Sequence, residues 1–285
     1  MISEPFDLTC HNGYRVAATA RRGIVPANAA ELVKALRAEP DAIIIGSGHN
    51  LILGRAHYED TFVVVSVDDL DESVCTFNGD TLTAYAGVSM KSLSVLAMEH
   101  GLAGLEMFYD IPSSLGGAVV MNAGANGEEI KDLLVDVTVF DRATGEVATL
   151  RCDEVGYGYR QSIFQQRREL IVLSATLRLL AGDRAAILER METIRAARWA
   201  KQPRDFPNAG SVFKRPPGRY VGQLMDELGL KGHRVGGAEL STKHGGFIVN
   251  TDGATGQDIL ELIAHIKSVV KQRFGIDLQQ EQVVI

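Results

Sequence analysis

Ser211 is the first candidate for a reactive side chain in this sequence. It lies in the segment NAGSVFKRP (208–216), directly after a glycine, with Lys214 and Arg215 three and four residues later. Two interpretations fit this segment: a turn serine with basic neighbours, or a hydroxyl that delivers a proton beside an anion-binding pair of cations. The sequence has no G-x-S-x-G elbow and no obvious His and Asp partners for Ser211, so hydrolase chemistry is disfavoured.

Two further charged side chains could act together with such a serine. Arg160 lies between aromatic residues in YGYRQSIF (157–164), where a permanently charged guanidinium could bind a carboxylate through two hydrogen bonds. Glu281 could stabilise a charge of the opposite sign if the last segment folds back, although surface charge is a strong alternative for a lone glutamate near a terminus. Phosphates could be bound by the basic residues Lys201, Lys214 and Arg215.

Two glycine-rich segments could surround a phosphate group or a ring system. IIIGSGHNLIL (43–53) places two glycines after a buried strand, and IPSSLGGAVVMNAGANGEEI (111–130) gathers several glycines around Asn122. Such loops expose backbone N–H groups, and two of them in one domain suit a dinucleotide. The first segment matches neither a G-x-G-x-x-G motif nor a P-loop, and the alternative for both is a turn or a tightly packed loop crossing.

Composition limits the kind of protein and its partners. The chain has 285 residues, of which 46% are hydrophobic, and this predicts a globular protein of about two domains. A net charge of −7 argues against general nucleic-acid binding. Residues 184–234 nevertheless carry 11 Lys and Arg against 5 Asp and Glu, an excess that could attract an anionic small molecule. The histidines and cysteines form no metal-binding motif, so no metal site is expected.

The cysteines and the N-terminal segment indicate a cytoplasmic protein. Cys10, Cys75 and Cys152 are far apart and odd in number, which fits free thiols in a reducing compartment. The start of the chain lacks a signal-peptide pattern, and no apolar run reaches the ~18 residues that span a membrane. We therefore expect no membrane association.

These side chains must be positioned by short strands and helices that alternate along the chain. Capping and apolar periodicity predict helices after Asn28, around Ser92–His100, from 182 to Trp199, up to Gly229 and over 257–274. Strands are predicted in 41–50, 61–67, 81–88 and 170–179, together with a hairpin turning at 143–145 and a terminal strand. The pattern indicates an α+β or α/β fold with a domain boundary at 182–200.

Six segments, taken together and in order, resemble the UDP-N-acetylenolpyruvoylglucosamine reductase (UDP-N-acetylmuramate dehydrogenase) family, flavoenzymes of bacterial cell-wall precursor synthesis. They are GSGHNLIL, IPSSLGGAVVMNAGANGEEI, YGYRQSIF, NAGSVFKRP, LKGHRVGGAELSTKHGGFIVN and DLQQEQVVI. The resemblance runs from about Asn12 to the C-terminus, and its most specific parts are the motifs around Ser211 and Arg160. The chain length and STKHGGFIVN resemble the shorter form of the family.

The resemblance implies an α+β fold with two domains. Residues 1–190 would form an FAD-binding domain of the vanillyl-alcohol-oxidase-like type, with two subdomains split near residue 70. Residues 191–285 would form an α/β substrate-binding domain, whose terminal strand carries Glu281.

The resemblance also implies the reaction and its residues. NADPH would reduce a non-covalently bound FAD, and the enolpyruvyl ether of a UDP-sugar would then be reduced to UDP-N-acetylmuramate. Ser211 would protonate the carbon next to the one that receives the hydride, while Arg160 and Glu281 would stabilise the enolate-like intermediate. Substrate contacts carry over to Lys201, Lys214, Arg215 and His244. FAD contacts carry over to Gly46, Ser47, Gly48, His49, Asn50, Leu51, Pro112, Gly116, Gly117, Asn122 and Gly124.

Some positions depart from the family pattern. The usual FRIGG is YRVAA here, so Ala17 and Ala18 replace two glycines, and the proline usual before the terminal glutamate is Gln280. Arg215 falls where the long form of the family has an asparagine that contacts substrate. His49 raises the alternative of a covalent flavin bond. The three catalytic positions are filled, which favours an active enzyme over a binding protein.

Two other functions stay open from the sequence. One is a related flavoenzyme that acts on another nucleotide sugar, and the other is a UDP-sugar-binding protein without turnover. A flavin spectrum that NADPH bleaches and the enolpyruvyl substrate restores would distinguish these from the reductase. We expect a monomer that binds no nucleic acid.

Overall fold

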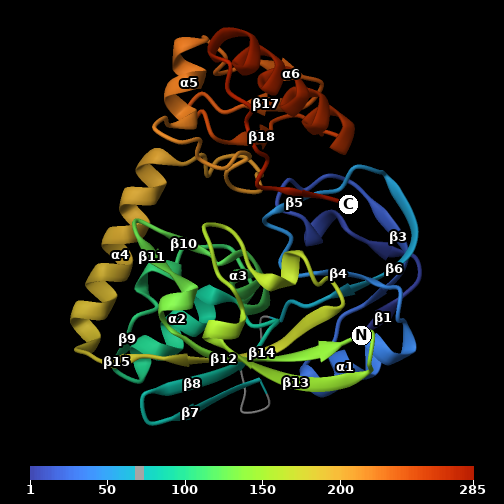
Figure 1. Cartoon of the computed structure of the whole chain (residues 1–285). Coiled ribbons are helices and arrows are strands. Elements are labelled where there is room, and N and C mark those ends of the chain that lie inside the picture. Colours follow the sequence, from blue (N-terminus) through green and yellow to red (C-terminus); the bar gives the residue numbers. More distant parts are fainter. Residues whose placement is uncertain (68–73) are drawn as a thin grey trace. The chain divides into compact units, whose positions relative to one another are not determined.

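The computed structural model describes residues 1–67 and 74–285, which form two compact units (Figure 1). The first unit comprises Met1–Ser3, Gly23–Ser47 and Thr61–Ala196, and the second comprises Glu4–Arg22, Gly48–Asp60 and Ala197–Ile285. The predicted boundary between subdomains near residue 70 lies outside the described residues. The predicted assignment of FAD binding to 1–190 and substrate binding to 191–285 stays a prediction, because compactness does not report what a segment binds.

A five-stranded antiparallel sheet forms the centre of the first unit. Its order is β13-β12-β14-β8-β7, and the predicted hairpin joins its first two strands with Gly145 in the left-handed conformation at φ 74°. Alternating apolar residues along β14 and β8 face a buried core, which explains why these segments form strands. The strands are β7 (Cys75–Asn78), β8 (Thr81–Tyr85), β12 (Leu134–Asp141), β13 (Glu146–Arg151) and β14 (Leu170–Arg178).

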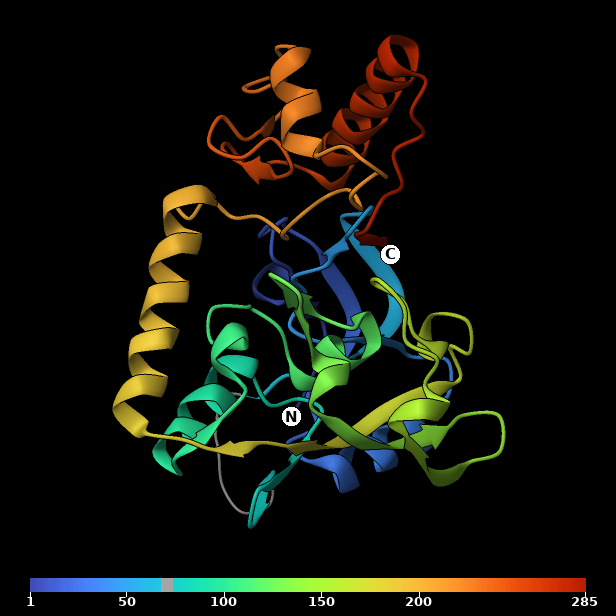
Figure 2. The same cartoon turned by 60° about the vertical axis from the view of Figure 1, so that its left-hand side comes forward.

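Helices α1 (Ala29–Ala38) and α3 (Leu115–Met121) pack on β14, and Figures 1 and 2 show them on opposite sides of this sheet.

Side chains cap the helices of this unit at their N-termini. The Asn28 side chain accepts the N–H of Glu31 at 3.0 Å, as the capping-box pattern predicts. Ser89 caps α2 (Met90–Glu99) and Ser114 caps α3 in the same way.

A second sheet contains strands from the N-terminal part of the chain. Its order is β1-β3-β6-β4, with β2 also paired to β3, and β4 and β6 run parallel. The residues of β3 and β6 are divided between the two units. The strands are β1 (Ile2–Ser3), β2 (Phe6–Asp7), β3 (Thr19–Ile24), β4 (Ile43–Ile45) and β6 (His57–Val64).

The second unit has its own apolar core, built on α6 (Gly256–Phe274) and α5 (Val221–Glu227). The predicted apolar face of α6 is buried, and Gly275 ends the helix at φ 70°. These helices accompany the antiparallel sheet β16 (Arg234–Val235), β17 (Ala238–Leu240) and β18 (Ile248–Asn250). The terminal strand β19 (Val283–Val284) pairs in parallel with β5 (Leu51–Ile52).

The other elements are short except for one helix. Helix α4 (Arg184–Lys201) is unbroken in Figure 2 and covers the predicted basic helix. The remaining strands are β9 (Leu102–Ala103), β10 (Gly124–Ala125), β11 (Glu128–Glu129) and β15 (Leu180–Ala181). The 3-10 helices are η1 (Thr9–His11), η2 (Glu106–Phe108), η3 (Ile130–Asp132), η4 (Cys152–Glu154) and η5 (Ile163–Gln165).

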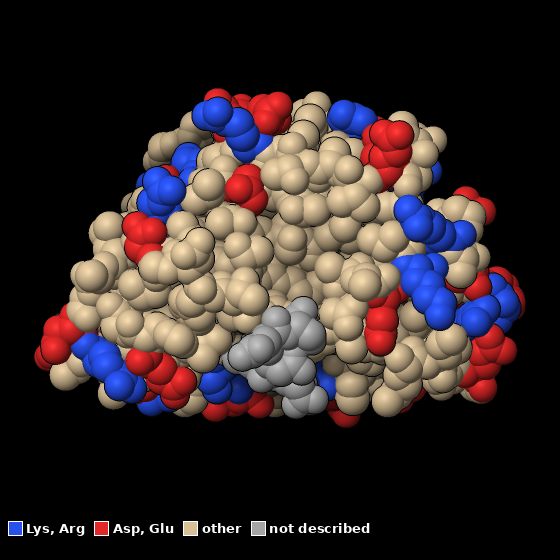
Figure 3. All heavy atoms as spheres, turned by 90° about the horizontal axis from the view of Figure 1, so that it is seen from below, with Lys and Arg blue, Asp and Glu red and all other residues tan. Residues whose placement is uncertain are grey.

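Charged side chains of both signs are interspersed on the face drawn in Figure 3, mostly towards its edge, around a largely uncharged centre. Within the described parts of the chain, no helix combines the length and the apolar character that crossing a membrane requires. The three cysteines are free thiols, as expected.

Candidate active site

Ser211 lies on a segment that is hydrogen-bonded on both sides. The N–H of Val212 donates to the carbonyl of Gly246 at 2.9 Å, and the N–H of Glu281 donates to the carbonyl of Val212 at 2.8 Å. Backbone bridges join Ser211 to Phe247 and Phe213 to Gln280. The terminal segment therefore folds back and brings Glu281 beside Val212, one residue after Ser211.

Part of the predicted cofactor loop lies against the same terminal segment. Asn50 donates from its side chain to the carbonyl of Glu281 at 3.3 Å, and its own carbonyl accepts the N–H of Val283 at 2.9 Å. A β-carbon on Gly210 would lie 3.8 Å from the carbonyl oxygen of His49. The second unit therefore brings residues 48–51, Ser211 and Glu281 together, although they are far apart in the sequence.

Residues 46–50 form a tight turn that requires glycine at its centre. Gly48 has a φ of 77°, and a β-carbon there would lie 2.1 Å from the carbonyl oxygen of His11, so only glycine fits. Among the described residues, the N–H groups of Ser47, Gly48 and Asn50 have no protein acceptor. Successive unpaired N–H groups can bind the phosphates of a dinucleotide, so this loop fits FAD.

The second glycine-rich segment packs closely on its protein neighbours. A β-carbon on Gly46 would lie 2.6 Å from the Ser114 hydroxyl oxygen, and one on Gly116 would lie 2.9 Å from the Ala86 side chain. Ser47 donates from its hydroxyl to the carbonyl of Pro112 at 3.1 Å. The two predicted cofactor segments therefore meet within the first unit. Close protein packing, the alternative considered for the sequence, explains these two glycines.

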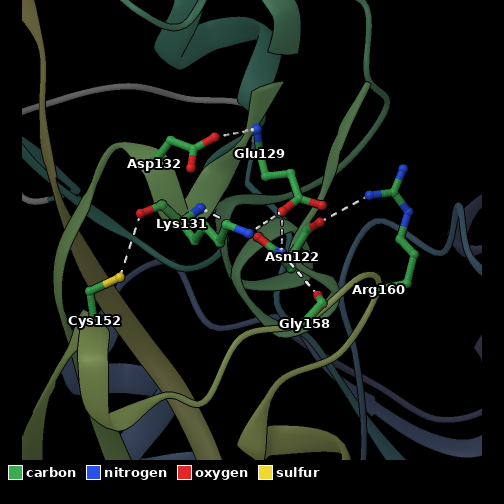
Figure 4. A network of polar contacts seen from close by, with 7 residues as sticks. All are labelled: Asn122, Glu129, Lys131, Asp132, Cys152, Gly158 and Arg160. Carbon is green, nitrogen blue, oxygen red and sulfur yellow. Dashed lines mark hydrogen bonds and ion pairs between the residues drawn. The ribbon is translucent and has the colours of Figure 1, made fainter. Parts of the chain in front are cut away.

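Arg160 is fixed by the turn that follows α3 (Figure 4). Its guanidinium donates to the carbonyl of Asn122 at 3.0 Å and to that of Gly124 at 2.5 Å, and it lies over the Tyr159 ring with 5.3 Å to the centroid. The Gln165 side chain donates to the Arg160 carbonyl at 3.1 Å. Because α3 ends at this turn, its dipole favours a cation here.

The turn itself is held by Asn122 and Glu129. Asn122 is fully buried with φ 45°, and its amide donates to the Glu129 carboxylate at 2.9 Å and to the Gly158 carbonyl at 3.0 Å. Burial alone would raise the pKa of Glu129, but hydrogen bonds from Lys131 and Asn122 and the charges of Lys131 and Arg160 outweigh it and lower the pKa. A carboxylate anion therefore sits between two cations.

The predicted FAD contact at Asn122 stays a prediction, and the structure adds a second use for this residue. Both of its amide N–H groups already donate within the protein. A β-carbon on Gly124 would lie 2.0 Å from the carbonyl oxygen of Glu128, so the hairpin around this turn also requires glycine. Asn122 and Gly124 therefore both help to hold Arg160 in place.

Several cations of the second unit are paired with carboxylates, but the predicted phosphate-binding residues are not. Within the described chain, Lys201, Lys214 and Arg215 form no ion pair. Lys201 ends the basic helix, and Lys214 follows Ser211 by three residues. The Arg215 guanidinium stacks on Tyr220 at 3.7 Å from the ring centroid, which fixes the plane of its donors. Paired cations include Arg219, Lys231, Arg234 and Lys271.

His244 is held beside the Ser211 segment. Its Nδ1 accepts the N–H of Gly246 at 3.1 Å, and its ring meets Phe247 edge-on with 4.8 Å between centroids. Burial lowers its pKa, and the charge of Lys231 lowers it further. His244 is therefore a neutral ring at pH 7, with Nε2 as its donor.

Sequence reasoning missed the residues that support these side chains. Glu129, Tyr220, Tyr14 and Gln282 all make side-chain contacts that fix a predicted site segment. Glu129, Gln282 and Tyr14 lie in segments quoted above, but their residue types alone do not indicate a supporting role until their contact partners are known. Among the described residues, no group of His, Cys, Asp or Glu could hold a metal ion.

Two protein-family models match separate parts of this chain. Residues 21–151 match an FAD-binding domain family, and residues 202–285 match the UDP-N-acetylenolpyruvoylglucosamine reductase C-terminal domain family. A reductase of that name from Francisella tularensis subsp. tularensis is 36% identical over 100% of both chains. One from Caldanaerobacter subterraneus subsp. tengcongensis is 40% identical over 95% of this chain and 89% of its own length.

A solved structure shares the fold. The UDP-N-acetylenolpyruvylglucosamine reductase of Thermus caldophilus superposes with a TM-score of 0.81 at 31% identity, covering 100% of this chain and 98% of its own. This similarity and the domain matches confirm the α+β fold with an FAD-binding domain and the C-terminal domain of the reductase family. The chain belongs to the UDP-N-acetylenolpyruvoylglucosamine reductase family.

Proposed function

We propose that the protein reduces the enolpyruvyl ether of UDP-N-acetylglucosamine to UDP-N-acetylmuramate, with Arg160, Ser211 and Glu281 as its catalytic residues. As a member of this family, the protein is an FAD-dependent oxidoreductase of peptidoglycan synthesis that uses NADPH. When bound, FAD would supply the hydride-transfer chemistry from NADPH to the methylene carbon of the substrate. The residues of this chain have to bind the substrate, stabilise the developing charge and supply the proton.

Ser211 supplies the proton to the carbon next to the methylene, which completes the reduction of the C=C bond. Its side chain is exposed on a segment whose backbone is paired on both sides, so the hydroxyl is accessible and its position is fixed. Arg160 and the Glu281 carboxyl group, acting as a hydrogen-bond donor, stabilise the enolate-like charge before that proton arrives. The guanidinium is positioned by the Asn122 and Gly124 carbonyls, so it requires little reorganisation.

The diphosphate of the substrate is bound by cations that have no carboxylate partner. Lys201, Lys214 and Arg215 fit this role, and stacking on Tyr220 orients Arg215. His244 contributes a neutral donor near the Ser211 segment. The N–H groups of Ser47, Gly48 and Asn50 would hold the FAD diphosphate, with FAD bound non-covalently.

One observation supports the assignment most directly. The N–H of Glu281 donates to the carbonyl of Val212, so the terminal segment returns to the Ser211 segment as the proposed roles require. Neither residue type alone would indicate this pairing, and the sequence separation of 69 residues makes it a property of the fold.

Two half reactions test the proposal. The FAD-loaded protein is mixed anaerobically with NADPH, and the flavin absorbance is followed before and after the enolpyruvyl substrate is added. We expect bleaching by NADPH and recovery with substrate. Persistent bleaching after substrate addition would refute the assigned reaction and favour a different nucleotide sugar or a binding protein.

We further propose that the enzyme works as a cytoplasmic monomer that binds neither nucleic acid nor a membrane. The net charge of −7 and the three free thiols support this proposal. Light scattering at working concentration should give the mass of one chain, 30.9 kDa.

A further inference from the structure

A buried polar pair in the second unit lies outside the proposed catalytic set. The Tyr14 hydroxyl donates to the Gln282 side-chain oxygen at 2.9 Å, and the two residues are 0% and 4% exposed. Burying such groups costs free energy unless their hydrogen bonds are satisfied. Burial also raises the pKa of Tyr14, so the phenol stays protonated and keeps donating at all working pH values.

The Gln282 side-chain nitrogen donates hydrogen bonds to the two residues before Ser211. It donates to the carbonyl of Ala209 at 2.9 Å and to that of Gly210 at 3.3 Å. An amide has two N–H donors, and both are aimed at this turn. Because Tyr14 donates to the oxygen, it fixes which end of the amide faces the two carbonyls.

These two carbonyls define the peptide planes that lead into Ser211. Gly210 has a φ of 77°, a left-handed conformation that the turn requires. The Asn208 side chain accepts the N–H of Gly210 at 3.2 Å, and a β-carbon on Gly13 would lie 2.7 Å from the Asn208 carbonyl oxygen. The turn is thus held from the N-terminal segment and from the terminal strand together.

Tyr14 is anchored on its other side as well. Its carbonyl accepts the Asn250 amide at 2.9 Å, and the N–H of Asn250 donates to the carbonyl of Pro207 at 2.9 Å. These contacts therefore form a closed loop. Gln282 binds the carbonyls of residues 209 and 210 and the Tyr14 hydroxyl, and Asn250 links Tyr14 to Pro207. A closed set of buried and partly buried neutral hydrogen bonds of this kind is rigid because each member orients the next.

We propose that Gln282 is the positioning residue for Ser211, and that Tyr14 sets the orientation of its amide. The inference rests on the proposed role of Ser211 in proton delivery. Gln282 directly follows Glu281, so the same terminal segment that presents the carboxyl group also fixes the turn that presents the hydroxyl. Displacing a reacting group by about 1 Å costs on the order of 10²-fold in rate, so the turn must be held this firmly.

The decisive variant is Gln282→Met, which keeps the approximate volume and removes all three hydrogen bonds. We expect the substrate-reducing half reaction to slow about 10- to 100-fold, while reduction by NADPH and the Kd for substrate stay within twofold. Amide hydrogen exchange of Gly210–Val212 should accelerate in the same variant. Gln279→Met is the matched control, because that side chain is exposed on the same segment, and it should behave as the wild type.

Tyr14→Phe tests the second part of the inference. It should slow the substrate-reducing half reaction less than Gln282→Met does, and it should add nothing in a Gln282→Met background, because Tyr14 acts through the amide. Additive effects of the two substitutions would overturn the role of Tyr14.

Two results separate this inference from the function on which it rests. If Ser211→Ala slows the second half reaction but Gln282→Met does not, the positioning role is refuted and the proposed function stands. If the wild type itself is not reoxidised by the enolpyruvyl substrate, the proposed function is refuted. Equal slowing of both half reactions by Gln282→Met, matched by a lower melting temperature, would show a structural residue and also refute the inference.

Discussion

Arg160 in the first unit and Ser211 in the second are supported by different kinds of interaction. The Arg160 turn is half-buried and ionic, with Glu129 in a short contact of 2.6 Å with Lys131 and hydrogen-bonded to Asn122. The Ser211 turn is supported by the neutral, buried side chains of Tyr14 and Gln282. Ionic interactions therefore stabilise the Arg160 turn, and hydrogen bonds between buried neutral side chains stabilise the Ser211 turn.

This difference predicts how each region fails. A half-buried ionic support is screened by solvent and depends on pH, so removing one charge weakens it gradually. A buried neutral network is insensitive to pH, but the loss of one member leaves polar groups without partners. The role of each support follows from its chemistry: a cation needs counter-charge, whereas a proton donor needs a fixed position.

The largest effect is expected for Ser211→Ala. Removing the proton donor should slow the substrate-reducing half reaction by about 10²- to 10⁴-fold and leave flavin reduction by NADPH nearly unchanged, because the proton is needed only in the second step. Anaerobic stopped-flow absorbance measures both steps. Equal slowing of the two would contradict the assigned role.

Arg160→Lys should come next, at about 10²- to 10³-fold on the same half reaction. Lysine keeps the charge but lacks the planar fork that donates to the Asn122 and Gly124 carbonyls, so the cation is no longer fixed. Single-turnover rates with saturating substrate measure the change. A variant as fast as the wild type would show that charge alone suffices.

Asn122→Gly should slow the second half reaction about tenfold, less than the ~10²-fold that a 1 Å displacement costs. Glycine tolerates the left-handed backbone at this position, so only the loss of the side chain is tested. Glu128→Gln is the control on the same hairpin, because Glu128 pairs with Arg190 and not with Asn122. If both variants slow the reaction alike, general loosening of the hairpin is the cause.

Substrate binding should change more modestly. Tyr220→Leu removes the stacking partner of Arg215, a cation–π contact worth about 0.5–1 kcal/mol at an exposed site, and should raise KM about two- to fivefold. The value of kcat should stay near that of the wild type, because Arg215 is assigned to the diphosphate. Steady-state kinetics decide, and a fall in kcat with unchanged KM would argue against that assignment.

The smallest effect concerns pH. The pKa of Glu129 is lowered from its ordinary value of 4.5, so its contribution to stability is present above pH 4.5 and is lost as the pH falls through the lowered value. Melting temperatures of the wild type and Glu129→Gln should therefore differ most near pH 7 and converge in acid. A constant difference across this range would mean that the carboxylate charge contributes nothing.

Motifs in the sequence sufficed to predict the family, the fold class, most α-helices and most strands of five or more residues, because these depend on local periodicity, capping and short glycine-rich segments. The N-cap at Asn28 and the stop at Gly275 are examples, since each uses neighbours within four residues. The sequence also identified Ser211, Arg160 and Glu281 as candidates from their residue types.

Only the tertiary structure decided what surrounds them. The pairing of Glu281 with Val212 joins residues 69 positions apart, and the bond between Tyr14 and Gln282 joins residues 268 positions apart. No local pattern specifies such contacts, because a single polar residue has no signature until its partner is near. The sequence thus determined which groups could react, and burial and long-range hydrogen bonds determined how they are held.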